Sequence, residues 1–130
     1  MKNFFFYWLP VLLYSSLIYI LSSRSSIPLI PPWPLVDKVL HFGAYVILGA
    51  LFSRAFQTTL LKTPRRNIVF LSIFFSSLYG LSDEIHQYFV PYRDADIMDV
   101  AADIAGSVCG ALGYESLDRI LKSLCRRFTD

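Results

Sequence analysis

Four stretches of the chain are long and apolar enough to cross a lipid bilayer, and this feature constrains the fold most. A transmembrane helix needs about 20 mainly apolar residues. The candidate spans are residues 4–21, 38–56, 68–88 and 96–114, and a tail follows at 115–130. Because backbone polar groups in lipid must be satisfied within the protein, we expect these spans to be α-helices. The sequence therefore predicts an all-α, polytopic membrane protein, a four-transmembrane-helix bundle that forms a single domain over residues 1–130.

The composition agrees with this prediction and excludes other classes of protein. Hydrophobic residues make up 55% of the chain and charged residues 17%, whereas an ordinary soluble domain has about 25% charged residues. The apolar content is too high for an intrinsically disordered chain. Two cysteines are too few for a disulfide-rich scaffold. We expect membrane lipids as partners and no nucleic acid.

Prolines indicate where the chain bends. Pro10 interrupts the first span, but a membrane helix tolerates a proline because neighbouring helices and waters satisfy the freed carbonyl. This span has no clear cleavage site, so we expect it to be retained rather than removed as a signal peptide. The segment from Ser25 to Pro34 contains four prolines and is predicted to be a non-helical loop. Residues 91–94 are predicted to form a short turn.

The distribution of basic residues predicts the orientation, since Lys and Arg favour cytoplasmic segments. Nine of the 12 basic residues lie at the N-terminus, around the 57–67 connector or in the tail. The other three are Arg24, Lys38 and Arg93. We therefore expect both termini inside (N-in/C-in). The tail is predicted to form a short C-terminal amphipathic helix on the membrane surface, with a simple extension of the last span as the alternative.

Small and polar residues recur at helical spacing in three of the spans. The stripes are Asp37, His41, Tyr45, Gly49 and Ser53; Ser72, Ser76, Gly80, Glu84 and Gln87; and Asp96, Asp99, Asp103, Gly106, Gly110 and Gly113. Small residues let membrane helices approach closely, so each stripe is expected to face the bundle interior. The ionisable ends of the stripes are then expected to form one layer near the outer membrane interface.

Several of these ionisable residues indicate function. Asp103 lies two turns inside its span, where an ionisable group is costly unless it is paired or solvated. We interpret Glu84 and His41 in the same way. Asp96 is also a plausible helix N-cap. Asp83 and His86 lie off the Glu84 face, and we expect them to be solvated interface residues.

Three blocks in this layer resemble the VanZ-like family of small bacterial membrane proteins. The first, DKVLHFGAY, begins at Asp37; the second, YGLSDEIHQYFVPYR, begins at Tyr79; and the third is Asp99 and Asp103 before Gly106. The resemblance implies a small protein of the bacterial plasma membrane and cell envelope, and the distribution of basic residues predicts that its site faces outward. Asp103 stands where many relatives have Asn. One family member is linked to glycopeptide (teicoplanin) resistance, an antibiotic-resistance role that the resemblance does not assign to this chain.

The first functional interpretation is that the polar layer binds or processes an anionic or lipid-linked envelope component, such as a cell-wall precursor. Lys38 and Arg93 would hold the anionic group, and His41 or Glu84 would act as general base. The catalytic candidates are His41, Glu84, Asp99 and Asp103. The candidate substrate-binding residues are Asp37, Lys38, Tyr45, Gln87, Arg93 and Asp96.

Three alternatives remain open from the residues alone. His41, Glu84, Asp99 and Asp103 are also candidate ligands for a divalent metal such as Mg²⁺, Mn²⁺ or Zn²⁺, which would make the chain a metal-dependent hydrolase. The network could instead be structural, with partner binding as the function. A proton-coupled transporter is the third alternative. The sequence does not decide whether the chain is an enzyme, nor its cofactor or oligomeric state.

Overall fold

The computed structural model describes residues 2–24, 34–93 and 95–129, and every regular element in these ranges is an α-helix. The helices are α1 (Lys2–Ser22), α2 (Pro34–Thr59), α3 (Arg65–Tyr88) and α4 (Ile97–Thr129). Each is long and apolar enough to cross a membrane. The prediction of an all-α, multi-pass bundle is therefore confirmed. The core of the predicted proline loop, residues 25–33, and Asp94 in the predicted turn lie outside the described residues.

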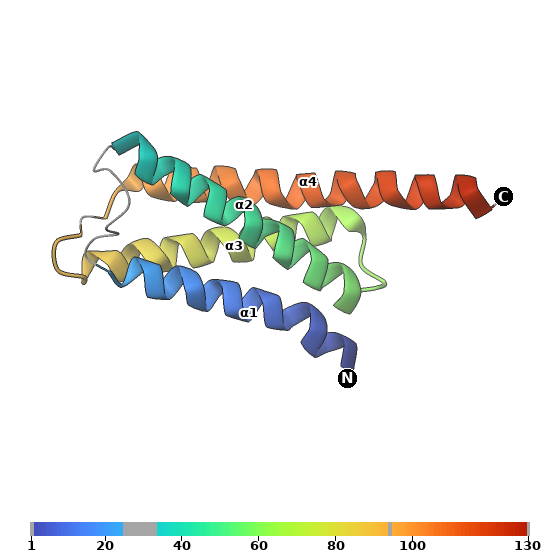
Figure 1. The fold of residues 1–130 in the computed structure, drawn as a ribbon, viewed down its shortest axis with the longest axis horizontal. Helices are drawn as coiled ribbons and strands as arrows, with labels where there is room; N and C mark the ends of the chain where they lie inside the picture. The colour runs from blue at the N-terminus through green and yellow to red at the C-terminus, as the bar shows by residue number, and fades with distance from the viewer. Residues whose placement is uncertain (1, 25–33, 94, 130) are drawn as a thin grey trace.

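Consecutive helices run in opposite directions along one bundle (Figure 1). The end where α3 leads into α4 is called the site end below. The α2–α3 connection and both ends of the chain lie at the opposite, terminal end. The helix α4 is the longest and continues past the other three at the terminal end (Figure 1).

Most helix ends lie within three residues of the predicted spans, and two differ by more. The helix α2 already begins at Pro34, because a proline is accommodated at the first helical position, where its missing N–H is not needed. The C-terminal segment is not a separate amphipathic helix; it continues α4 to Thr129. No glycine or proline interrupts this part of the chain. Ion pairs from Glu115 to Arg119 and from Asp118 to Lys122, each one turn apart, support its continuation.

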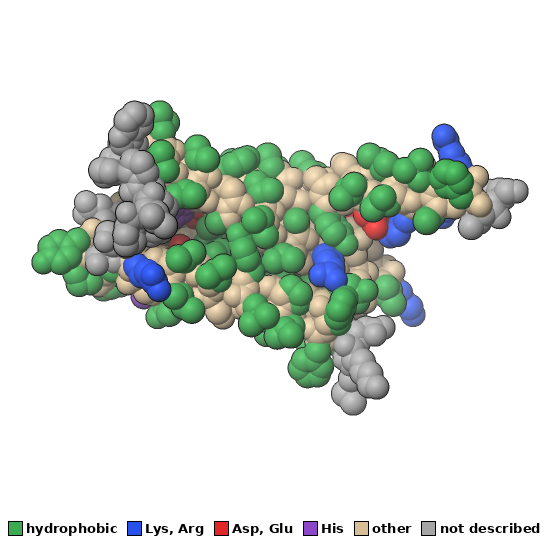
Figure 2. Space-filling model, in the orientation of Figure 1, with side chains coloured by type: hydrophobic (Ala, Val, Ile, Leu, Met, Phe, Trp, Pro, Cys, Tyr) green, Lys and Arg blue, Asp and Glu red, His purple; other side chains and the backbone are tan. Residues whose placement is uncertain are grey.

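The bundle exposes its large apolar side chains and buries many small polar ones. Hydrophobic side chains cover most of the face between the two ends (Figure 2). The exposed set includes Phe5, Leu12, Leu13, Phe70 and Phe74, whereas Ser53, Ser72, Ser76 and Ser107 are fully buried. This distribution suits a protein surrounded by lipid, where helices associate through close packing of small residues rather than through a hydrophobic driving force.

The helices α2 and α4 touch through their backbones. A Cβ atom added at Gly49 would lie 2.6 Å from the Ser107 carbonyl oxygen. Added at Gly106 or Gly110, it would overlap the carbonyl oxygen of Phe42 or Val46, respectively. These three glycines therefore permit the approach, as the predicted small-residue stripes require.

Gly113 does not belong to this contact, although the sequence analysis placed it on the same stripe. It is exposed, and a Cβ added there would meet nothing within 4 Å. The buried face of α4 comprises Gly106 and Gly110 together with a four-residue repeat: Asp99, Asp103, Ser107, Ala111 and Glu115. Helices pack along such rows because residues four apart lie one above the other.

The helix α1 packs against α2 and α3 and completes the bundle. In its N-terminal half, the Trp8 ring makes edge contacts with Phe52 and Phe56. Farther along, the Tyr79 hydroxyl donates a hydrogen bond to the Ser15 carbonyl oxygen at 2.6 Å. These contacts hold the C-terminal end of α1 beside the ionisable residues at the site end.

Candidate functional site

The ionisable ends of three helices meet at the site end, as the helical spacing predicts. The four catalytic candidates, His41 on α2, Glu84 on α3, and Asp99 and Asp103 on α4, are all buried. Each helix brings its residue to this point because the small residues farther along the same stripe let the backbones come together. The structure thus joins residues that lie up to 62 positions apart in the chain.

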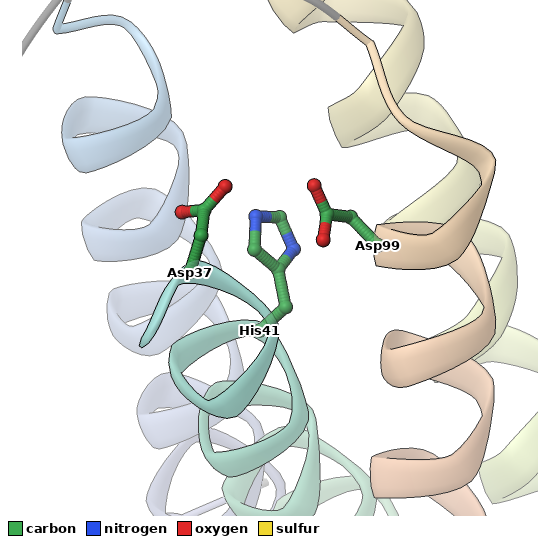
Figure 3. Close-up of side chains that lie close together, drawn as sticks. All are labelled: Asp37, His41 and Asp99. Carbon is green, nitrogen blue, oxygen red and sulfur yellow. The ribbon is translucent and has the colours of Figure 1, made fainter. Parts of the chain in front are cut away.

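His41 lies at the centre of the cluster. Its Nδ1 is 3.0 Å from Asp103 Oδ1 and 3.8 Å from Glu84 Oε1. Figure 3 shows the ring between the carboxylates of Asp37 and Asp99. When Nδ1–H donates to Asp103, the lone pair of Nε2 is free of any hydrogen bond from the described residues. An imidazole oriented in this way by a carboxylate can accept a proton from a ligand.

Lys38 crosslinks α2 to the beginning of α4. Its Nζ lies 2.5 Å from Asp96 Oδ2 and 3.0 Å from Asp99 Oδ1. Asp96 also caps α4, because its Oδ1 accepts the Met98 N–H at 2.9 Å, and its own N–H donates to Glu84 Oε2 at 3.1 Å. The Lys38 ammonium and then the Met98 N–H hold the pKa of the Asp96 carboxyl below its usual range.

Arg93 is positioned by a short chain of hydrogen bonds. Its Nε and Nη2 donate to Gln87 Oε1 at 3.1 and 2.5 Å, and Gln87 Nε2 donates to Asp83 Oδ2 at 3.2 Å. The expectation that Asp83 is a solvated interface residue is therefore wrong, because Asp83 is only 5% exposed. It lies four residues before Gln87, and this spacing brings the two side chains together.

At the site end, Lys38 and His41 form ion pairs, whereas Arg93 forms none with the residues that the structure describes.

His86, the other residue expected at the interface, faces α1. Its ring lies 4.6 Å from the Tyr19 ring, and its Nε2 lies 2.9 Å from Ser23 Oγ. His86 therefore helps to hold α1 in place and does not join the His41 cluster.

A cavity of about 270 Å³ opens beside His41 between α1, α2 and α3. One part of its wall is apolar and another part is polar or charged. The apolar lining includes Ile18, Leu21, Leu40 and Ala44, and the polar lining includes Ser22, Asp37, His41, Tyr45, Asp83, Gln87 and Arg93. The structure therefore brings most of the predicted substrate-binding residues to one cavity, whereas Lys38 and Asp96 are engaged with each other beside it.

Two overlapping groups of side chains at this site have the donor atoms for a metal ion. The first is Asp37, His41 and Asp99, and the second is His41, Glu84 and Asp103. In each group the ligand atoms lie within 4.8 Å of one another. Glu84 Oε1 and Asp103 Oδ2 are buried and accept no hydrogen bond from the described residues. Carboxylate and imidazole donors suit Mg²⁺, Mn²⁺ or Zn²⁺.

Three features of the structure were not among the predicted ones. Ser107 donates to Ser76 across the α3–α4 contact at 2.8 Å. Glu115, predicted to lie in the cytoplasmic tail, is 3% exposed and accepts hydrogen bonds from Gln57, Arg65 and Arg119. The four-residue repeat from Asp99 would have identified both residues. The apolar wall supplied by α1 was not anticipated, because nothing polar marks those positions.

A comparison with curated proteins finds a relative in the fission yeast Schizosaccharomyces pombe (strain 972 / ATCC 24843), named "Uncharacterized protein C11E3.10". The two are 31% identical over 75 residues, which is 58% of this chain and 44% of the yeast protein. This chain thus spans less than half the length of that relative. No solved structure matches the chain. The model of one family, described as VanZ/LLP1, matches residues 2–120. The chain, with its clustered family motifs, therefore belongs to the VanZ/LLP1 family.

Proposed function

We propose that this protein binds, and with His41 processes, an anionic amphiphile such as a membrane lipid or a lipid-linked envelope precursor. The observation that carries the proposal is the divided lining of the cavity beside His41. Ile18, Leu21 and Leu40 offer an apolar wall suited to an acyl or prenyl chain. His41, Gln87 and Arg93 offer polar groups suited to a headgroup. Ligand sites commonly combine an apolar lining with a few polar groups that fix orientation.

Arg93 is the cation we assign to the anionic group of the ligand. Its guanidinium lines the cavity and is held by Gln87 through Nε and Nη2, so Nη1 remains available to a ligand. Arginine suits carboxylate and phosphate groups because its planar donors match their oxygens. Lys38, the other predicted anion ligand, is already paired with Asp96 and Asp99. We therefore assign Lys38 to holding the site together.

His41 is the residue we assign to proton transfer. Asp103 accepts the hydrogen bond of Nδ1 and so orients the ring, which borders the cavity. An oriented imidazole can remove a proton from a hydroxyl or a water molecule at its other nitrogen. Glu84, whose Oε1 lies 3.8 Å from Nδ1, would stabilise the protonated ring. In this proposal Asp103 and Glu84 are positioning residues for His41.

The proposed location is the bacterial plasma membrane, with the site at the outer face. The excess of basic residues near the terminal end supports this orientation. Glycopeptide resistance is not part of the proposal.

The proposal is tested by the lipids that co-purify with the full-length protein. Mass spectrometry of lipids bound to the wild type should show one enriched anionic class. Arg93→Ala should reduce that class about tenfold or more, because a hydrogen bond to a charged group contributes roughly 1.5–3 kcal/mol. Arg24→Ala is the matched control, since Arg24 is an exposed arginine near the end of α1 and outside the cavity lining. Identical lipid sets from wild type and Arg93→Ala would refute headgroup binding by Arg93.

A divalent metal ion at the same cluster is the second candidate function. It is favoured by the charge of the site, where six carboxylates face only two permanent cations and one imidazole. The cations are Lys38 and Arg93, and the carboxylates are Asp37, Asp83, Glu84, Asp96, Asp99 and Asp103. A cation held by His41, Glu84 and Asp103 would offset this excess and could itself contact an anionic headgroup. The protein would then act as a metal-dependent hydrolase or a metal-bridged lipid binder.

A further inference from the structure

We propose that a basic groove at the terminal end, between the beginning of α3 and the extension of α4, binds the phosphate headgroup of an anionic membrane lipid. The groove has a volume of about 280 Å³. Its lining is Arg65 from α3 and Arg119, Lys122, Ser123 and Arg126 from α4. It is distinct from the cavity beside His41, because Asp99 and Lys122 are separated by about 35 Å along α4 at 1.5 Å per residue.

Buried and half-buried carboxylates hold the cations of the groove in place. Arg65 Nη1 lies 2.9 Å from Glu115 Oε1 and 3.4 Å from Asp118 Oδ2. Arg119 Nε lies 2.8 Å from Glu115 Oε1, and Lys122 Nζ lies 2.6 Å from Asp118 Oδ2. Glu115 also accepts a hydrogen bond from Gln57 at 2.8 Å. Side chains that are already ordered lose less conformational entropy when a ligand binds.

These contacts leave donors for a ligand. Arg65 uses only Nη1 and Arg119 only Nε in hydrogen bonds with described residues. The side chains of Arg65, Arg119 and Lys122 are 43%, 67% and 57% exposed, so their remaining N–H groups are accessible. Three cations of the lining, Arg65, Arg119 and Lys122, contact two carboxylates among the described residues, Glu115 and Asp118, so this part of the groove keeps a positive charge.

The first turn of α3 adds to the attraction for an anion. Pro64 is its N-cap residue and makes no side-chain cap hydrogen bond. The N–H groups of Asn67 and Ile68 bond to the Pro64 carbonyl oxygen, whereas those of Arg65 and Arg66 bond to no described residue. A helix N-terminus with open N–H groups carries partial positive charge and favours phosphate. Together with the flanking cations, it makes this groove suited to a phosphate group.

The surface beside the groove favours a lipid over free phosphate. The same part of α4 exposes an apolar row, Leu117, Ile120, Leu121 and Leu124. A lipid whose headgroup lies in the groove can pack its acyl chains along this row, whereas free phosphate gains nothing there. Basic clusters at the ends of membrane helices recognise anionic headgroups in this manner.

Native mass spectrometry of the full-length protein in detergent tests the groove. The probes are phosphatidylglycerol, phosphatidylcholine and inorganic phosphate. In an Arg93→Ala background, which removes the anion ligand proposed for the cavity beside His41, we expect the protein to bind phosphatidylglycerol more tightly than phosphatidylcholine, and inorganic phosphate in excess not to displace it. The double variant Arg119→Ala/Lys122→Ala should weaken phosphatidylglycerol binding about tenfold or more, because each basic residue near an anionic lipid contributes roughly fivefold.

The control variant is Lys62→Ala/Arg66→Ala, which removes the same charge from exposed positions at the same end but outside the groove lining. It should change the affinity less than twofold. Equal weakening by the two double variants, or equal affinity for the two lipids, would overturn the proposal. Displacement by inorganic phosphate would identify a free-phosphate site and also overturn it. If the double variant does not fold, the single variant Lys122→Met replaces it in the measurement. The Lys122 side chain is exposed, so its substitution should leave the packing of the bundle unchanged.

Discussion

The imidazole of His41 belongs to two groups of acidic side chains, and some of the buried carboxylate oxygens beside it accept no hydrogen bond from the described residues. Glu84 Oε1 and Asp103 Oδ2 accept no hydrogen bond from any residue that the structure describes. Leaving a buried polar group unsatisfied costs roughly 1–3 kcal/mol, and more for a charged group. A bound cation, a proton or a ligand would remove that cost. At the scale of single residues, the cluster is therefore better suited to binding a cation, a proton or a ligand than to stabilising the bundle.

We expect the metal content of the purified protein to distinguish these possibilities. If the second candidate function is correct, elemental analysis by mass spectrometry will find one divalent ion per chain in the wild type. Glu84→Gln and Asp103→Asn should each lose it, because each replaces a ligand oxygen of the His41 group with a weaker neutral donor. Asp118→Asn, which changes a carboxylate at the terminal end, should retain the ion. A wild type without stoichiometric metal would eliminate the metal candidate.

The residues of the candidate site were predictable where they repeat at helical spacing. His41, Glu84, Asp99 and Asp103 lie on stripes that also carry small residues, so their burial followed from the need to pack helices closely. Asp83 and Glu115 were not predicted, because each looks like an interface or tail residue until its partner is known. Their burial depends on Gln87 and Arg65, respectively, which only the tertiary arrangement brings near.

At the scale of elements, the contact between α2 and α4 dominates the packing. Gly49, Gly106 and Gly110 allow the two backbones to touch, and side chains at the site end then meet across this contact. Lys38 and His41 on α2 both reach carboxylates on α4 for this reason. The separation of the two helices therefore sets the geometry of the ion pairs in the site.

Gly110→Ala should destabilise the folded protein by about 1–3 kcal/mol, because overpacking a tight contact forces the backbone to shift. The added Cβ would overlap the Val46 carbonyl oxygen. Gly113→Ala is the matched control, since its Cβ would meet nothing within 4 Å. That substitution should be neutral or stabilising by up to about 1 kcal/mol, because alanine favours helix more than glycine does. Thermal unfolding in detergent measures both, and equal shifts would contradict the assigned backbone contact.

The four helices could be predicted from length and apolar content, but the beginning of α2 could not, and the extension of α4 was expected only as the alternative to a separate amphipathic helix. Hydropathy locates the part of a helix that lies in lipid, whereas its ends depend on capping and on neighbouring charges. The beginning of α2 at Pro34 and the extension of α4 to Thr129 both lie outside the predicted spans at residues 38–56 and 96–114. The connection at residues 60–64 is short, and it was correctly expected as part of the basic connector.

At the scale of the whole molecule, the charges divide between the two ends of the bundle. Seven acidic and three basic residues belong to the predicted outer side, whereas nine basic and three acidic residues belong to the inner side. The structure brings the end of α1, the beginning of α2 and the α3–α4 connection to one end and the α2–α3 connection to the other (Figure 1). The formal net charge of +2 is therefore the sum of an acidic end and a basic end.

Cysteine labelling in intact cells tests the orientation inferred from this division. In a chain whose native Cys109 and Cys125 are replaced by serine, Tyr92→Cys should react with a membrane-impermeant thiol reagent. Tyr92 is 96% exposed in the α3–α4 connection. Leu61→Cys, at an 82% exposed position in the α2–α3 connection, should react only after the membrane is permeabilised. The reverse pattern would invert the topology and place the His41 cavity at the cytoplasmic face.

The continuity of α4 has a mechanical consequence. One helix carries Asp99 and Asp103 near one end and Glu115, Arg119 and Lys122 toward the other, with no break between them. A helix of this kind behaves as a stiff rod, so a rotation about its axis turns both sets of side chains by the same angle. An event that rotates α4 against α2 at either end therefore changes the alignment of charged groups about 35 Å away.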